Sequence, residues 1–268
     1  MTAWQAILLG ILQGVTEFLP ISSSGHLVIV PHIMGWPDPG LVMGAMLHVG
    51  TLIAILGFFA SDLWDLVKAA IESLTRRSMA NPDARIAWAV VIGTVPGALL
   101  GFFLEDLFER LFGMPKAAAG FLFVTAALLL VAEYVGRRER PLTTVSWYDA
   151  ILVGLAQALA IAPGISRSGA TIAAGMLLGL NREDAARFSF FLAVPIMIGS
   201  GGYQILKLMR GAVVTASTSI VILGVVSAAV SGYLAIAGLM ALVRRQRLVG
   251  FAVYCVLMGT LVITGVLG

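Results

Sequence analysis

Long apolar runs separated by short polar segments dominate this chain of 268 residues. A helix needs about 20 consecutive apolar residues to cross the hydrocarbon core of a bilayer. Six runs come close to that length: Leu41–Ala60, Ile86–Leu104, Ala117–Val135, Phe188–Leu206, Ser217–Val243 and Gly250–Leu267. The pattern predicts an all-α integral membrane protein with six transmembrane helices.

Two further apolar stretches, Trp4–Gly35 and Ala150–Leu180, are interrupted near their middle by proline, glycine and serine. Proline lacks the backbone N–H that a helix interior needs, and glycine favours turns over helices. We therefore expect each stretch to form two short helices joined by a break. The stretch is either a re-entrant hairpin, which returns to its own side of the membrane, or two short spans.

The two interrupted stretches resemble each other. A shift of 144 residues aligns Ala6–Gly25 with Ala150–Gly169 without a gap, and nine of the 20 positions are identical. Each half then holds one broken hairpin and three spans, and three crossings turn the second half upside down. The sequence thus predicts a single membrane domain over residues 1–268, an inverted-topology repeat whose halves cover about 1–140 and 145–268. In such repeats the site usually lies where the broken helices of both halves meet.

Composition excludes most soluble classes of protein. Apolar residues make up 59% of the chain, charged residues only 12%, and the mean hydropathy is +0.99, whereas a soluble domain carries about 25% charged residues. The net charge of +3 is small and dispersed, so no nucleic acid is expected as a partner. A single cysteine, Cys255, excludes an intrachain disulfide and a cysteine-based metal cluster.

Lysine and arginine are unevenly divided between the two sets of loops. Twelve fall on one side: Lys68, Arg76, Arg77, Arg85, Arg137, Arg138, Arg140, Arg182, Arg187, Arg244, Arg245 and Arg247. Four fall on the other: Arg110, Lys116, Lys207 and Arg210. Since cytoplasmic loops carry the excess of these residues, the first set is predicted to be cytoplasmic and the C-terminus to lie outside. Glu133 is expected to be solvated at this cationic rim.

Both interruptions carry charged and hydroxyl side chains at membrane depth. The first contains Glu17, Ser22, Ser23, Ser24, Gly25 and His26, and the second contains Ser166, Arg167, Ser168 and Gly169. An ionised side chain at the bilayer centre costs roughly 2.5–3.5 kcal/mol on insertion scales, so such residues are kept mainly for function. A purely structural ion pair between Glu17 and Arg167 is the alternative.

These residue types favour an anion site with a nucleophile. Broken helix ends leave N–H groups unpaired, serine hydroxyls add donors, and the planar fork of Arg167 matches two phosphate oxygens at once. A phosphorylated or pyrophosphorylated ligand is expected, although a carboxylate would also fit. Ser23 and His26 lie three residues apart and share a helix face, which favours a nucleophile–base pair. The alternatives make His26 the nucleophile itself or a buried structural histidine.

Other polar residues give weaker signals. Gln13 and Gln157 match in the repeat alignment, and each either contacts a ligand or bonds across the repeat interface. His48 either lines the same cavity or has a capping or packing role.

Two segments resemble a known family. Gln13–His26 and Pro163–Ile172 look like the two signature segments of bacterial undecaprenyl-diphosphate phosphatase, the bacitracin-resistance protein family. Gly93–Gly97 and Phe188–Pro195 also resemble the family, so the similarity extends along nearly the whole chain.

The resemblance implies a multi-pass protein of the bacterial plasma (inner) membrane whose active site faces the extracytoplasmic side. Such a phosphatase hydrolyses undecaprenyl diphosphate to undecaprenyl phosphate and phosphate. This recycles the lipid carrier for peptidoglycan and envelope glycan synthesis and confers bacitracin resistance. The resemblance also implies two inverted repeats with re-entrant helix pairs, and a divalent cation, Mg²⁺ or Ca²⁺, as cofactor.

Mapped by motif, the resemblance assigns catalytic roles to Glu17, Ser23 and His26. It assigns diphosphate binding to Ser166 and Arg167, and the serines and glycines around the breaks complete that set: Ser22, Ser24, Gly25, Ser168 and Gly169. Accessory roles fall to Gln13, Thr16, His48 and Gln157. Gln13 stands at the first position of the first motif, where members of the family have either a glutamate or, as here, a glutamine, so the cation is expected to be held mainly by the substrate, with Glu17. Gly44 stands where an acidic residue often precedes the histidine corresponding to His48, which weakens a role for that segment.

One other class of function remains open on sequence grounds. Inverted repeats with broken midplane helices also suit a transporter or flippase of an anionic, phosphorylated lipid. The partners expected from the sequence are undecaprenyl diphosphate and membrane lipid. Oligomeric state is undetermined, and a homodimer is open.

Overall fold

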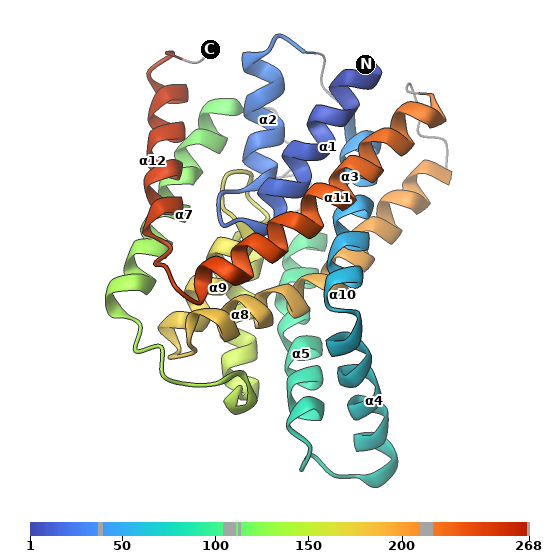
Figure 1. The fold of residues 1–268 in the computed structure, drawn as a ribbon, viewed down its shortest axis with the longest axis vertical. Coiled ribbons are helices and arrows are strands. Elements are labelled where there is room, and N and C mark those ends of the chain that lie inside the picture. The colour runs from blue at the N-terminus through green and yellow to red at the C-terminus, as the bar shows by residue number, and fades with distance from the viewer. Residues whose placement is uncertain (37–39, 104–110, 112–113, 210–216, 267–268) are drawn as a thin grey trace.

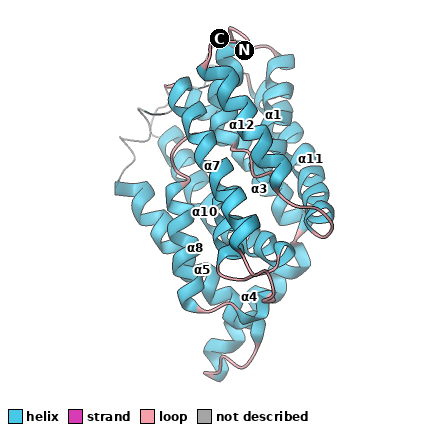
Figure 2. Ribbon diagram, turned by 90° about the vertical axis from the view of Figure 1, so that its left-hand side faces the viewer, coloured by secondary structure: helices cyan, strands magenta, loops and turns pink. Residues whose placement is uncertain are grey.

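The computed structural model describes residues 1–36, 40–103, 111, 114–209 and 217–266, and all regular structure in this part of the chain is helical (Figure 2). The first half contains α1 (Ala3–Phe18), α2 (Ser23–Ile33), α3 (Gly40–Phe58), α4 (Ala60–Arg76), α5 (Pro82–Phe103) and α7 (Pro115–Val135). A 3-10 turn at Leu142–Thr144 precedes the second half. That half contains α8 (Trp147–Leu159), α9 (Arg167–Leu177), α10 (Arg182–Met209), α11 (Thr218–Val243) and α12 (Val249–Ile263).

Four described helices are long and apolar enough to cross a membrane: Pro82–Phe103, Pro115–Val135, Arg182–Tyr203 and Thr218–Val243. The number is five if α3 and α4, which meet at an angle of 79°, form one broken span. The expected run Gly250–Leu267 corresponds to α12, which has 15 residues. The ends of two expected runs, Leu104 and Leu267, lie outside the described residues, as do Arg110 and Arg210 of the cation count.

Both interrupted stretches form two short helices joined by a break, as the sequence predicts. In the first, Leu19 has extended backbone angles directly before Pro20, because the proline ring disfavours a helical conformation in the preceding residue. In the second, Gly164 has a φ of 102°, which glycine adopts without a steric cost. The start of α1 and the end of α12 lie at one end of the molecule, and the turn between α4 and α5 lies at the other (Figure 1).

Glycines allow two pairs of helices to pack backbone against backbone. A Cβ atom added to Gly10 of α1 would lie 2.4 Å from the carbonyl oxygen of Gly224 in α11. A Cβ atom added to Gly154 of α8 would lie 2.2 Å from the carbonyl oxygen of Gly93 in α5. The hydrophobic effect is weak between helices in lipid, so helices associate there mainly through van der Waals contact. Small residues at such crossings allow the backbones to come close enough for that contact.

Replacement of Gly10 by leucine is expected to destabilise the fold. The new side chain would meet backbone atoms of α11 and push the two helices apart, at a cost of about 1–3 kcal/mol. Gly238→Leu is the matched control, because a Cβ atom there has no neighbour within 4 Å. A fluorescence melt in detergent should show a lower midpoint for Gly10→Leu only, and equal midpoints for both variants would contradict this packing.

The cationic loops meet around one buried carboxylate, Glu133 at the end of α7. Arg182 donates to it at 2.8 and 2.6 Å, Arg138 donates at 2.8 Å, and the N–H of Leu248 donates at 2.9 Å. The expectation of a solvated Glu133 is therefore wrong, since the residue is only 3% exposed. It joins the end of α7 to the α9–α10 and α11–α12 connections, which explains why a carboxylate is tolerated in this buried position.

A candidate active site where the two breaks meet

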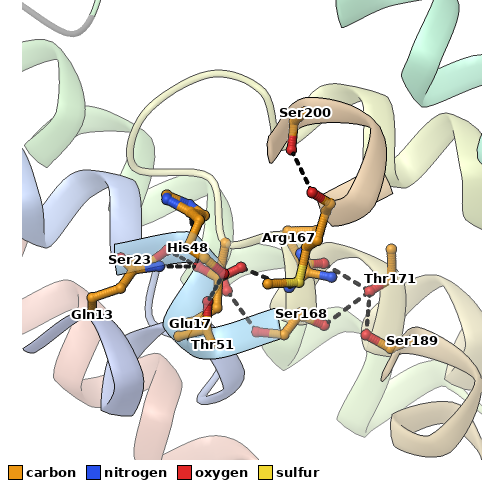
Figure 3. Close-up of polar contacts among 12 residues, drawn as sticks. Gln13, Glu17, Ser23, His48, Thr51, Arg167, Ser168, Thr171, Ser189 and Ser200 are labelled. Atoms are coloured by element: carbon orange, nitrogen blue, oxygen red, sulfur yellow. Dashed lines mark hydrogen bonds and ion pairs between the residues drawn. The ribbon is translucent and has the colours of Figure 1, made fainter. Parts of the chain in front are cut away.

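The two breaks contact each other directly, although they lie about half the chain apart. The backbone N–H of Gly164 donates to Ser22 Oγ at 3.2 Å, and Ser168 Oγ donates to the carbonyl of Leu19 at 3.1 Å. The end of α1, the start of α2 and the start of α9 thereby converge on one place (Figure 3).

Glu17 at the end of α1 is the centre of this cluster. Its carboxylate accepts hydrogen bonds from Ser23 Oγ at 2.5 Å, from Gln13 Nε2 at 3.0 Å and from Arg167 Nη2 at 2.7 Å. Glu17 itself is 7% exposed. Its burial is compensated by the charge of Arg167 and by two neutral donors, which is the condition for keeping an ionised carboxylate away from water.

Arg167 is the first residue of α9, and part of its guanidinium has no hydrogen-bond partner among the described residues. Of the three guanidinium nitrogens of Arg167, only Nη2 has partners within the described part of the chain. These are Glu17 and, at 3.8 Å, Met197 Sδ. The side chain is 14% exposed. An arginine carries five N–H donors, so Arg167 can hold an incoming anion with the donors that Glu17 does not use.

Several of the expected diphosphate ligands also hold the two breaks together. Ser22 Oγ caps α2 by accepting from the N–H of Gly25 at 3.3 Å, and Ser166 Oγ caps α9 by accepting from the N–H of Gly169 at 3.0 Å. Ser22, Ser166 and Ser168 are each 1% exposed. Of the serines in the two breaks, only Ser23 and Ser24 are partly exposed.

The glycines of the two caps are needed for close approach. A Cβ atom on Gly25 would lie 3.1 Å from the Cα atom of Gly164, so this residue allows the first break to touch the second. A Cβ atom on Gly169 would lie 3.0 Å from the Cβ atom of Ser166. The geometry therefore gives both glycines a role in shaping the breaks.

Ser23 and His26 share a helix, but the structure does not bring them together as the expected pair. The hydroxyl of Ser23 points to Glu17. The ring of His26 points to other partners, with Nδ1 2.7 Å from the carbonyl oxygen of Ser22 and Nε2 2.8 Å from the hydroxyl of Tyr254. The proton acceptor beside Ser23 is thus a carboxylate, because packing against α12 turns the imidazole away.

His48 of α3 belongs to the cluster, even though its sequence signal was weak. Its Nε2 atom lies 3.7 Å from Glu17 Oε2, and its side chain is 37% exposed. Nδ1 lies 2.8 Å from the carbonyl oxygen of Gly44 and must donate to it, so Nε2 is the atom presented to the carboxylate. Thr51 steadies this turn by donating to the carbonyl of His48 at 2.9 Å.

The other expected accessory residues differ in their placement. Gln13 contacts Glu17, and its own Oε1 atom is buried without a partner in the described part of the chain. Gln157 is buried against Gly97 with both amide atoms unpartnered there. Thr16 donates to the carbonyl of Leu12 in its own helix at 2.7 Å.

The donor set does not form a metal cage on its own. Among the described residues, no group of three or more His, Cys, Asp or Glu side chains is arranged to hold an ion. The cluster offers one carboxylate, Glu17, with the unpartnered Gln13 Oε1 beside it. Mg²⁺ usually takes one or two carboxylates and completes its shell with water and substrate phosphates, so these residues fit a cation that arrives with a phosphorylated ligand.

The sequence model of the bacitracin resistance protein BacA family matches residues 6–261, which include every residue of the cluster. The chain belongs to the BacA family. The match covers both breaks and α12 as far as residue 261, so the site described above lies wholly within the matched residues.

Proteins from several other organisms are similar to the chain over almost its full length. A Thermomicrobium roseum protein named undecaprenyl-diphosphatase is 43% identical over 267 residues, which covers 97% of this chain and 96% of the relative. Proteins of the same name from Rubrobacter xylanophilus and Methanosphaera stadtmanae are 44% and 42% identical, with coverage of 93% and 96% of both partners, respectively.

Proposed function

We propose that this member of the BacA family is a membrane phosphatase that hydrolyses undecaprenyl diphosphate to undecaprenyl phosphate and phosphate. The observation that carries the proposal is the contact of Ser23 Oγ with Glu17, 2.5 Å apart, beside the guanidinium of Arg167. A hydroxyl, a proton acceptor and a phosphate-binding fork are the groups that phosphoryl transfer to a serine requires. Relatives that carry the name undecaprenyl-diphosphatase support the identity of the substrate.

In the proposed mechanism Arg167 binds the diphosphate with the donors that Glu17 leaves free. Ser23 Oγ attacks the terminal phosphorus, and Glu17 accepts the hydroxyl proton. The bond from that phosphorus to the bridging oxygen breaks, and undecaprenyl phosphate leaves with the bridging oxygen. A water molecule then cleaves the phosphoserine ester, releases phosphate and restores the hydroxyl. Glu17 takes the role of base that the sequence alone suggested for His26.

We further propose that a divalent cation, Mg²⁺ or Ca²⁺, enters with the substrate and that Glu17 is its protein carboxylate. When bound, the cation offsets negative charge on the diphosphate. Gln13 supplies the neighbouring amide oxygen, which has no other partner in the described structure.

The proposed topology is the one expected from the sequence: a single domain with six spans, two re-entrant hairpins and inverted halves of about 1–140 and 145–268. The matching contacts of α1 with α11 and of α8 with α5 support it, because α1 and α8 are equivalent in the repeat. We propose that the cationic loops around Glu133 are cytoplasmic and that the site opens to the extracytoplasmic side of the plasma membrane. Homodimer formation stays a prediction.

The first test is phosphate release from undecaprenyl diphosphate by the purified protein in detergent. We expect release that EDTA stops and that excess Mg²⁺ or Ca²⁺ restores, because the protein alone offers the cation one carboxylate. Release that is unaffected by EDTA would contradict the role of the cation. No release by folded protein would contradict the phosphatase and favour the transporter or flippase of an anionic lipid, which lipid-transfer assays in vesicles would then detect.

A further inference from the structure

The imidazole of His26 has a defined proton arrangement, although it does not contact Ser23. Nδ1 lies 2.7 Å from the carbonyl oxygen of Ser22. A carbonyl only accepts, so Nδ1 must carry the hydrogen. In the neutral ring Nε2 then holds the lone pair, and the donor facing it is the hydroxyl of Tyr254 at 2.8 Å.

Tyr254 contacts His26 in two ways. Its ring is stacked on the imidazole, with ring centres 5.6 Å apart and planes inclined by 13°, while its hydroxyl bonds Nε2. Tyr254 belongs to α12 and lies 228 residues after His26 in the chain. Sequence patterns around the two breaks therefore give no sign of this contact.

The surroundings favour a strong hydrogen bond between these two residues. His26 is 1% exposed. Tyr254 is 40% exposed and lines an open groove of about 550 Å³ between α1 and α12, whose other lining is mostly apolar, including Leu12, Val15 and Phe251. A hydrogen bond in such a medium is stronger than in water and costly to leave unmade.

The atom that His26 holds is part of the turn that presents Ser23. Ser22 has a φ of 72°, an uncommon and strained value for a residue with a side chain. Such a backbone persists only where its surroundings hold it, and the hydrogen bond from His26 Nδ1 to the Ser22 carbonyl is one of the contacts that do so, beside the backbone N–H of His26, which donates to the same carbonyl at 3.2 Å. Ser23 follows directly, and its hydroxyl reaches Glu17 from that turn.

We propose that Tyr254 is a positioning residue for the phosphatase reaction: it orients the imidazole of His26, which holds the Ser22 turn and so aims the Ser23 hydroxyl at Glu17. The effect on catalysis rests on the proposed function, whereas the effect on the imidazole does not. Neither Tyr254 nor His26 needs to touch the substrate in this role.

The experiment is a comparison of Tyr254→Phe with the wild type and with Tyr233→Phe. Phenylalanine keeps the stacked ring and removes only the hydroxyl. Tyr233 of α11 is the matched control, because its ring packs on Phe58 and lies outside the cluster. We expect kcat to fall by about 10- to 100-fold in Tyr254→Phe with little change in KM, since misplacement of a reacting group by about 1 Å costs up to about 10²-fold.

A double-mutant cycle tests whether Tyr254 acts through His26. In a His26→Gln background, Tyr254→Phe should cause no further loss, because the atom that it orients is gone. Losses that multiply in the double variant would show that Tyr254 acts on its own and would overturn the proposal, as would an unchanged kcat in Tyr254→Phe.

A spectroscopic measurement keeps the inference independent of the activity. The chain has three histidines, so ¹⁵N-histidine labelling gives few ring signals, and the set lost in His26→Gln identifies His26. We expect the wild type to show a single neutral ring with hydrogen on Nδ1, and Tyr254→Phe to show exchange or an altered Nε2 shift. An Nε2 shift that does not change would overturn the proposal even in an active enzyme. If the wild type releases no phosphate, the proposed function fails while this measurement still decides the role of Tyr254.

Discussion

Replacement of Ser23 by alanine is expected to reduce phosphate release by on the order of 10³-fold or more, because no nucleophile would remain beside the bound diphosphate. The hydroxyl of Ser23 bonds Glu17, and Ser23 is partly exposed. Ser22, by contrast, is buried, and its Oγ atom caps α2. The alanine side chain fits within the space of the serine, so the fold should be retained.

The measurement for Ser23→Ala is single-turnover phosphate release, with Ser219→Ala as the control. Ser219 is an exposed residue at the start of α11, and its hydroxyl lies 3.1 Å from that of Ser217, far from the cluster in the sequence. Acid quenching of the wild type should also trap a phosphorylated peptide that contains Ser23. Full activity in Ser23→Ala together with loss in His26→Ala would make the histidine the nucleophile and would refute the mechanism proposed above.

Replacement of Arg167 by alanine is expected to lower kcat/KM for undecaprenyl diphosphate by roughly 10³-fold, the size of effect seen when an arginine that contacts a transferring phosphate is removed. The alanine variant also leaves Glu17 buried without its charged partner, which threatens the fold. Arg167→Lys separates these effects, because it keeps a positive charge near Glu17 but loses the planar fork that contacts two phosphate oxygens.

We expect Arg167→Lys to fold with a melting temperature close to that of the wild type and to lose roughly tenfold or more in kcat/KM. Arg245→Lys is the control, since Arg245 is exposed in the α11–α12 connection. Phosphate release and a fluorescence melt in detergent would be measured for all three variants. Wild-type kcat/KM in Arg167→Lys would show that charge alone suffices, and wild-type kcat/KM in Arg167→Ala would remove Arg167 from the binding site.

An ion pair between Glu17 and Arg167 was raised from the sequence only as the structural alternative, because charged residues are rare at membrane depth. Arg167 is the only charged residue between Ala150 and Asn181, so few partners could compensate Glu17. The repeat alignment places the two breaks at equivalent positions, so both are expected at the same depth in the membrane. In the structure Arg167 Nη2 lies 2.7 Å from Glu17 Oε1.

The partners of His26, His48 and Glu133 could not be predicted in the same way. Spacing of three residues puts Ser23 and His26 on one helix face, but the rotamer of each side chain depends on what packs against it. For His26 that neighbour is Tyr254 of α12, and for Glu133 it is Arg182 beyond the second break. The bend between α3 and α4 was likewise unforeseen, because the apolar run continues through Phe59 without a proline or a polar residue at the junction, and Gly57 alone did not indicate a break.

The class of the protein, the two broken stretches and the family could all be inferred from the sequence. Apolar run length, the missing N–H of proline and the cost of a buried charge are local properties that each residue carries with it. Two features followed only from the way the helices pack: Glu17 rather than His26 accepts the hydrogen bond of Ser23, and His48 joins the cluster. Those outcomes depend on contacts between helices far apart in the chain, where packing sets the direction of each side chain.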